Sequence, residues 1–148
     1  MIDAGDSCSF NIKGHSGAKL HFKNFSIKNT ISFLDYIMGG CNINVHVAID
    51  YTMSNKDPSD PQSLHYLSHQ MTNGYTEAIK SVIGVLQNYD SDQMFPTYGF
   101  GGKPPTCDRV SHCFALNGDI FDPECSGVKG VMNTYYKSLN LVKLWGNT

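Results

Sequence analysis

The chain has 148 residues, and its 41% hydrophobic and 11% aromatic content is enough for one globular domain with a sizeable core. Its 11 Lys and Arg residues are nearly balanced by 13 Asp and Glu residues, which gives a formal net charge of -2 at pH 7. Because nucleic acids and anionic membrane surfaces attract clustered positive charge, the lack of any basic run in the sequence argues against an electrostatic site for either.

The sequence also predicts a compartment. Residues 1–6 are acidic and polar, unlike a secretory signal, and no apolar run approaches the length of a bilayer span. The five cysteines are odd in number and irregularly spaced. We therefore expect reduced thiols in a cytoplasmic protein.

Residues 1–30 are predicted to form a short β segment. Apolar and polar side chains alternate in residues 8–12 and again in residues 19–23, on either side of a glycine-containing turn at 14–17. This period-two alternation around a turn indicates a β-hairpin. Since an isolated hairpin is only marginally stable in water, we expect the segment to be the end of a larger β module.

Residues 31–41 are predicted to be a linker with a short helix. Apolar side chains recur at helical spacing in residues 32–38, and Gly39 with Gly40 marks the expected helix end.

Residues 42–148 follow the pattern of an α/β domain. The run 43–49 is almost continuously apolar, as in a strand that is buried on both faces. The elements expected after it, in chain order, are a polar loop at 55–73, an amphipathic helix from 75 to about 89, strands at 94–101 and 110–116, a helix at 130–141 and a short element at 142–145. This order predicts a mostly parallel sheet with flanking helices.

Asp50, Thr52 and Ser54 form a candidate metal site. They directly follow the strand predicted at 43–49, and ligands of α/β folds bind at the carboxyl ends of strands. One carboxylate and two hydroxyls on one loop are oxygen ligands, which Mg²⁺, Mn²⁺ and Ca²⁺ prefer, whereas zinc prefers imidazole or thiolate. The spacing alone is common, and it is the α/β context that favours a divalent cation here.

Other reactive side chains have simpler interpretations. Ser/His combinations occur at residues 63–65 and 111–112, but catalytic partners also need an orienting acid and an oxyanion site, so we expect no enzyme. Cys107, Cys113 and Cys125 lack the paired Cys-x-x-Cys spacing of zinc sites.

Residues 90–92 begin like a calcium loop, but Met94 and Phe95 stand where such a loop needs an oxygen ligand and a glycine. A turn that ends the preceding helix is expected instead. The glycine cluster at 99–103 lacks the spacing of nucleotide-binding loops, and we expect it to let a strand end turn sharply. The tyrosines at helical positions are expected to be packing groups: Tyr75, Tyr89, Tyr135 and Tyr136.

Several segments together resemble the copine family. They are residues 32–37, 39–40, 47–52, 54–55, 63–66, 89–92, 95–96 and 99–101, and the resemblance runs in order from about Gly17 to Thr148. It implies two C2 domains followed by a von Willebrand factor A-like domain, with calcium-dependent binding to phospholipid membranes and recruitment of target proteins. On this basis residues 1–30 are expected to be the end of a C2 domain, residues 31–41 a linker, and residues 42–148 the N-terminal part of a truncated A-like domain.

The resemblance also gives the candidate site its family role. Asp50, Thr52 and Ser54 match a metal-ion-dependent adhesion site, with Thr replacing its first Ser, and Thr148 matches the threonine of the second loop, although Asn147 stands where Pro is usual. The third loop and its Asp are expected beyond Thr148, so the cation should bind weakly.

Two functions follow from the resemblance. In the first, the cation bridges the chain to an acidic residue of a target protein, while phospholipid contact and calcium-dependent association with the plasma membrane depend on C2 domains absent from these residues. In the second, the chain is a truncated copine fragment without independent activity.

Overall fold

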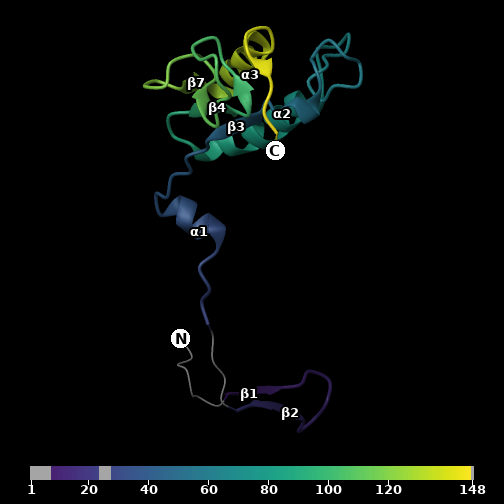
Figure 1. The fold of residues 1–148 in the computed structure, drawn as a ribbon. Helices are drawn as coiled ribbons and strands as arrows, with labels where there is room; N and C mark the ends of the chain where they lie inside the picture. Colours follow the sequence, from purple (N-terminus) through teal and green to yellow (C-terminus); the bar gives the residue numbers. More distant parts are fainter. Residues whose placement is uncertain (1–7, 24–27, 148) are drawn as a thin grey trace. The chain divides into compact units, whose positions relative to one another are not determined.

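The computed structural model describes residues 8–23 and 28–147, and the chain divides into two compact units, Met1–Gly40 and Cys41–Thr148 (Figure 1). The division falls within the linker predicted at residues 31–41. The assignment of the predicted segments to C2 and A-like domains stays a prediction.

The first unit contains the predicted hairpin. Strands β1 (Cys8–Asn11) and β2 (Lys19–Phe22) pair antiparallel, and Phe10 lies opposite Leu20. Gly14 and Gly17 have φ values of 90° and 83°, a left-handed conformation that glycine adopts without steric cost. The turn glycines therefore fix the position of the hairpin, as expected.

The same unit contains the predicted linker helix, α1 (Phe33–Met38). Ser32 caps its N-terminus by accepting from the Asp35 backbone N–H, and the Asp35 carboxylate accepts from the Ser32 N–H at 2.8 Å. The helix ends at Gly39, and Gly40 has a φ of 89°. Local sequence thus determines both ends of this helix.

The second unit has a sheet centred on β4 (Met94–Phe100). Its neighbours are β3 (Val47–Asp50), β6 (Phe114–Ala115) and β7 (Glu124–Ser126). The β3–β4 pair is parallel, with Val47 opposite Thr97 and Asp50 opposite Phe100, whereas β6 and β7 both run antiparallel to β4. A separate antiparallel pair joins β5 (Gly102–Lys103) to β8 (Lys143–Leu144).

The α/β class is confirmed, but a mostly parallel sheet is not: over the described ranges, β3–β4 is the one parallel pair. Parallel pairing needs a long crossover, usually a helix. Helix α2 (Gly74–Leu86) supplies it between β3 and β4, while β6 and β7 return to β4 through connections that contain no helix.

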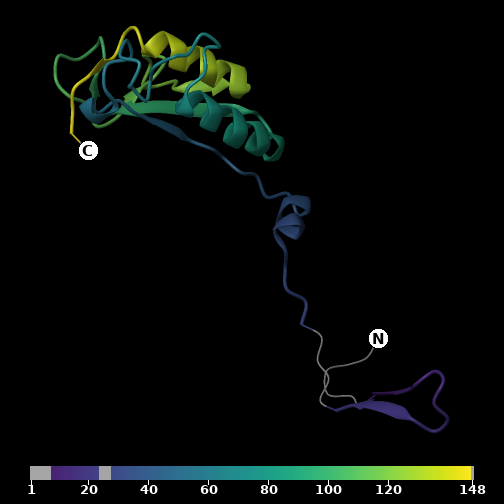
Figure 2. The same cartoon turned by 90° about the vertical axis from the view of Figure 1, so that its right-hand side faces the viewer.

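The core of this unit is formed by side chains of the sheet and of two helices, α2 and α3 (Gly127–Ser138). Figures 1 and 2 show the ribbons of these elements. A short 3₁₀ turn, η2 (Gln87–Tyr89), continues α2. The buried apolar side chains form one cluster: Ile49, Tyr51, Ile79, Ile83, Phe95, Phe114, Leu116, Cys125, Val131, Met132, Tyr135 and Val142. Apolar side chains at helical spacing on α2 and α3 explain this burial. On β4 the buried alternate positions are Phe95, Thr97 and Gly99, of which Phe95 joins the cluster.

Several predicted boundaries were wrong. The strand expected at 43–49 begins only at Val47, and Ala48 is exposed, so the expected burial on both faces is not seen. The strand expected at 110–116 is limited to β6, and β5 and β7 were missed because strands this short carry no periodicity. The last helix begins and ends earlier than the expected 130–141. Within the described parts of the chain, no helix is long and apolar enough to cross a membrane.

Candidate metal site

The candidate site is the loop at residues 50–55, which leaves β3 at its carboxyl end. Tyr51 is still hydrogen-bonded to β4, because its N–H donates to the Phe100 carbonyl at 2.8 Å. The chain then turns into the 3₁₀ helix η1 (Met53–Asn55). The loop is therefore at the strand end where the sequence predicted it.

The three predicted ligands in this loop lie close together. The Thr52 N–H donates to Asp50 Oδ1 at 2.7 Å, and Thr52 Oγ1 lies 3.0 Å from Ser54 Oγ. Asp50 is half-buried, Thr52 is 1% exposed, and Ser54 is exposed. The loop thus brings one carboxylate and two neighbouring hydroxyls together. Of the two hydroxyl residues, Thr52 is buried and Ser54 lies at the surface.

The segment before Thr148 reaches this loop. The Met53 N–H donates to the Gly146 carbonyl at 2.8 Å, and the Gly146 N–H donates to the Gly101 carbonyl at 2.7 Å. Thr148 itself lies outside the described residues, so its role as a ligand stays a prediction.

The glycine cluster at 99–103 lets two backbones approach each other beside the site. Gly101 has a φ of 73°, and a Cβ added there would lie 2.4 Å from Thr52 Cγ2. A Cβ added at Gly102 would lie 2.8 Å from Tyr51 Cβ. The cluster therefore does more than allow a sharp turn, because it makes room for two residues of the loop.

Asn55 stabilises the loop from inside. It is 3% exposed, and its Nδ2 donates to the Thr52 carbonyl at 3.2 Å and to Thr52 Oγ1 at 3.3 Å. Its Oδ1 accepts from Tyr75 Oη at 2.8 Å. Sequence reasoning missed this role, although a small amide directly after the motif is a residue type that can cap such a turn.

His65 lies behind the loop and is fully buried. Its Nε2 is 2.8 Å from the Asp50 carbonyl oxygen, and its Nδ1 is 2.9 Å from Tyr135 Oη. The imidazole stacks on Tyr75 with ring centroids 4.4 Å apart, and on Tyr51 at 5.2 Å. Burial lowers the pKa of His65, so the ring is neutral at pH 7. No local sequence pattern predicts these contacts, because they join distant segments.

The tyrosines around His65 are packing groups, as expected, but they also form hydrogen bonds. Burial, with a smaller contribution from the Asp50 charge, raises the pKa of Tyr75 to about 12. Burial also raises the pKa values of Tyr51 and Tyr135. All three phenols are therefore protonated and able to donate at neutral pH.

The other reactive side chains of the described residues have structural contacts or are ungrouped. Cys41, Cys107, Cys113 and Cys125 are free thiols, and in the described part of the chain no three His, Cys, Asp or Glu side chains are grouped to hold a metal ion. At residues 111–112 the Ser111 hydroxyl donates to the Cys113 carbonyl at 2.8 Å.

Residues 90–92 form the predicted turn at the end of the helix, with a buried carboxyl group. Asp90 is 4% exposed, and neither of its carboxylate oxygens has a hydrogen-bond partner of good geometry. Burial, and after it the neighbouring Asp92, raises the pKa of Asp90, while the backbone N–H groups of Asp92 and Gln93 offset part of this rise.

The chemistry of the loop fits a hard divalent cation. The side-chain atoms of Asp50, Thr52 and Ser54 that can coordinate a metal are all oxygens. They lie on one turn that internal hydrogen bonds already hold. With a single carboxylate among these three residues, the loop carries little charge to hold an ion, and the expected weak affinity stays a prediction.

A comparison with known families finds one match over more than half of the chain. The family model described as Copine matches residues 63–148. The matched region contains His65, α2, β4 and α3, and begins after the loop at residues 50–55. The match therefore covers residues that support the loop, but not β3 or the loop itself.

Proposed function

The chain belongs to the copine family, and on this premise we propose that residues 50–54 bind a divalent cation, Mg²⁺, Mn²⁺ or Ca²⁺, in a module that recruits a target protein. The observation that carries the proposal is the 3.0 Å approach of Thr52 Oγ1 and Ser54 Oγ directly after the Asp50 carboxylate. The side chains of Asp50, Thr52 and Ser54 all offer oxygen ligands, at the carboxyl end of a strand.

Each residue has a distinct role in this proposal. Asp50 supplies the negative charge, while Thr52 and Ser54 supply neutral oxygens, and Thr148 would add a hydroxyl from the second loop. A bound cation would offer a free coordination position to an acidic side chain of the target protein. The exposure of Ser54 supports this, because a partner must approach the loop from the solvent side.

We propose binding rather than catalysis. Both ring nitrogens of His65 are engaged, by Asp50 and by Tyr135, so the imidazole is not available as a general base. The Ser63 hydroxyl donates to the carbonyls of Asn55 and Lys56, each at 2.9 Å. The Ser63/His65 combination is thereby accounted for by structural contacts.

The wider proposal follows the family resemblance. We propose that the second unit is part of a von Willebrand factor A-like fold, which the β3–α2–β4 crossover with its parallel strands supports. Calcium-dependent phospholipid binding would reside in C2 domains, of which residues 1–30 resemble the end, and the protein would be cytoplasmic and associate with the plasma membrane when calcium rises.

Isothermal titration of the full chain with Mg²⁺, Mn²⁺ and Ca²⁺ tests the cation site. The Asp50→Asn variant keeps a side-chain oxygen for the Thr52 N–H but loses the charge, so it should bind no cation. Asp108→Asn, at an exposed aspartate outside the loop, is the matched control and should bind like the unaltered chain. Absence of binding by the unaltered chain, or equal binding by Asp50→Asn, would favour the alternative of a fragment without independent activity.

A further inference from the structure

We propose that His65 is a positioning residue for the cation site, because it holds the Asp50 carbonyl at the point where β3 turns into the loop. The inference rests on the proposed function for its effect on cation affinity. The donation from His65 Nε2 to the Asp50 carbonyl follows from the contact alone, because that carbonyl can only accept.

The contacts fix the tautomer of His65. The Asp50 carbonyl can only accept, so Nε2 must carry the proton in the 2.8 Å contact. In a neutral imidazole Nδ1 is then an acceptor, and Tyr135 Oη must donate to it across 2.9 Å. The Asn73 Nδ2 in turn donates to Tyr135 Oη at 2.9 Å. Each bond in this relay therefore has only one direction.

The ring itself has no freedom to turn. Tyr75 and Tyr51 stack against it with interplanar angles of 12° and 17°. Tyr51 is held as well, since its Oη bonds to Ser138 Oγ and Ser138 Oγ donates to the Tyr135 carbonyl at 2.6 Å. Because that carbonyl can only accept, Tyr51 is the donor in its bond to Ser138.

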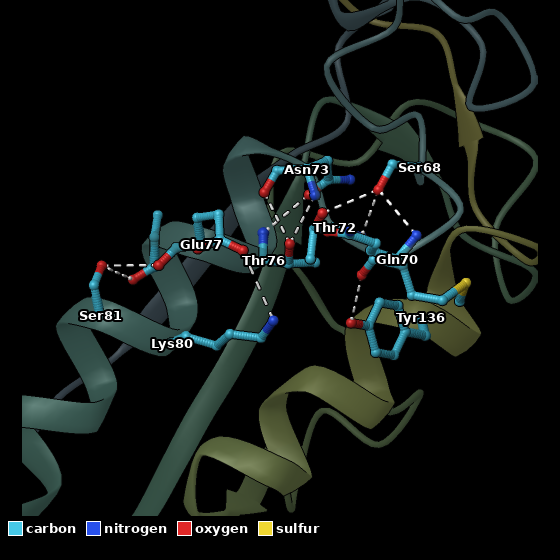
Figure 3. A network of polar contacts seen from close by, with 11 residues as sticks. Ser68, Gln70, Thr72, Asn73, Thr76, Glu77, Lys80, Ser81 and Tyr136 are labelled. Carbon is cyan, nitrogen blue, oxygen red and sulfur yellow. Dashed lines mark hydrogen bonds and ion pairs between the residues drawn. The ribbon is translucent and has the colours of Figure 1, made fainter.

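The relay starts from a helix terminus that is independently fixed. Asn73 is the N-cap of α2: its Oδ1 accepts from the Thr76 N–H at 2.9 Å, and its own N–H donates to Thr76 Oγ1 at 2.8 Å (Figure 3). The loop before it is tied to α3 through Tyr136, which Figure 3 labels. Its Oη donates to the Met71 carbonyl at 3.0 Å. His65 thus connects the Asp50 loop to the N-terminus of α2 and to α3.

Loss of His65 would take from the Asp50 carbonyl the side-chain donor that lies 2.8 Å from it, just where the chain leaves the sheet. The other side-chain donor near that carbonyl is Tyr75 Oη at 3.4 Å, a long contact from a hydroxyl that bonds to Asn55 at 2.8 Å. The Asp50 carboxylate accepts from the Thr52 N–H, and both groups move when the Asp50 backbone moves. A shift of that backbone would therefore separate the ligands that the cation needs together.

Three substitutions at His65 separate positioning from packing. His65→Gln places an amide N–H near the position of Nε2 and keeps a donor for Asp50. His65→Asn reaches only the position of Nδ1, next to Tyr135, and His65→Leu fills space without hydrogen bonds. We expect the Gln variant to bind Mn²⁺ within about threefold of the unaltered chain, and the Asn and Leu variants to bind about 10- to 100-fold more weakly. Circular dichroism and thermal unfolding show which variants fold, and cation affinities are compared among those variants.

Two readouts on the cation-free chain complete the test. Nitrogen-15 NMR at neutral pH should show a protonated Nε2 and an unprotonated Nδ1 for His65, and the Thr52 amide should exchange faster in the Asn variant than in the Gln variant. A proton on Nδ1, or equal exchange and equal affinity in the Gln and Asn variants, would overturn the inference. If the unaltered chain binds no Mn²⁺, the proposed function fails, and the tautomer with the Thr52 exchange still decides the role of His65.

Discussion

Replacement of Gly101 by Ala tests the close approach between the end of β4 and the candidate site. Gly101 has a φ of 73°, and an added Cβ would lie 2.4 Å from Thr52 Cγ2 and 3.2 Å from the Thr52 backbone nitrogen. To restore ordinary contact near 3.4 Å, the Thr52 methyl must move back by about 1 Å. Thr52 is buried and bonded to Asp50 and Asn55, so it cannot move alone.

The expected loss of stability has two sources. A left-handed backbone at a non-glycine residue costs about 1–2 kcal/mol, and overpacking of a tight site costs about 1–3 kcal/mol. The lower entropy of the unfolded alanine chain offsets about 0.4–1 kcal/mol. We therefore expect Gly101→Ala to lower the free energy of unfolding by about 1–5 kcal/mol, with a central value of about 3 kcal/mol.

Gly118→Ala is the matched control, because Gly118 has a φ of 91° but no atom within 4 Å of an added Cβ. It carries the backbone cost alone, so we expect a loss of about 1 kcal/mol. Urea unfolding followed by circular dichroism measures both variants, and titration with Mn²⁺ should show weaker binding for Gly101→Ala only. Equal stability of the two variants would refute the argument that Thr52 occupies the space beside Gly101.

Three further predictions concern buried polar groups. Tyr135→Phe removes the donor to His65 Nδ1 and the acceptor of Asn73, so it should lower the free energy of unfolding in urea by about 1–3 kcal/mol, whereas Tyr136→Phe should cost less because its bond is exposed. The lowered pKa of His65 means that the unfolded chain takes up a proton near the ordinary pKa of 6.5 while the folded chain does not. The free energy of unfolding should therefore fall as the pH drops below that value. In His65→Gln the free energy of unfolding should depend less on pH. Asp90→Asn removes a buried carboxylate whose pKa is raised, so thermal unfolding at pH 7 should show equal or higher stability, and a lower melting temperature would contradict this account.

The local elements followed from the sequence. Alternation around Gly14 and Gly17 predicted the hairpin, Ser32 and Gly39 bracketed α1, and the spacing of apolar side chains predicted α2. These elements depend on residues within one or two turns of each other, so their signals lie in short windows. The motif at residues 50–54 was readable for the same reason, because its three donors lie on one loop.

Strand pairing and the support of the site depended on tertiary structure. The direction of β6 and β7 relative to β4 is decided by contacts between segments that no local pattern joins. His65 meets Asp50 across 15 positions and Tyr135 across 70, and Asn73 meets Tyr135 across 62. The sequence around a histidine in a polar loop does not predict which phenol and which carbonyl the imidazole contacts. The sequence by itself therefore predicted which oxygens form the candidate cation site, while only the packing of two helices against the strand end decided how those oxygens are held.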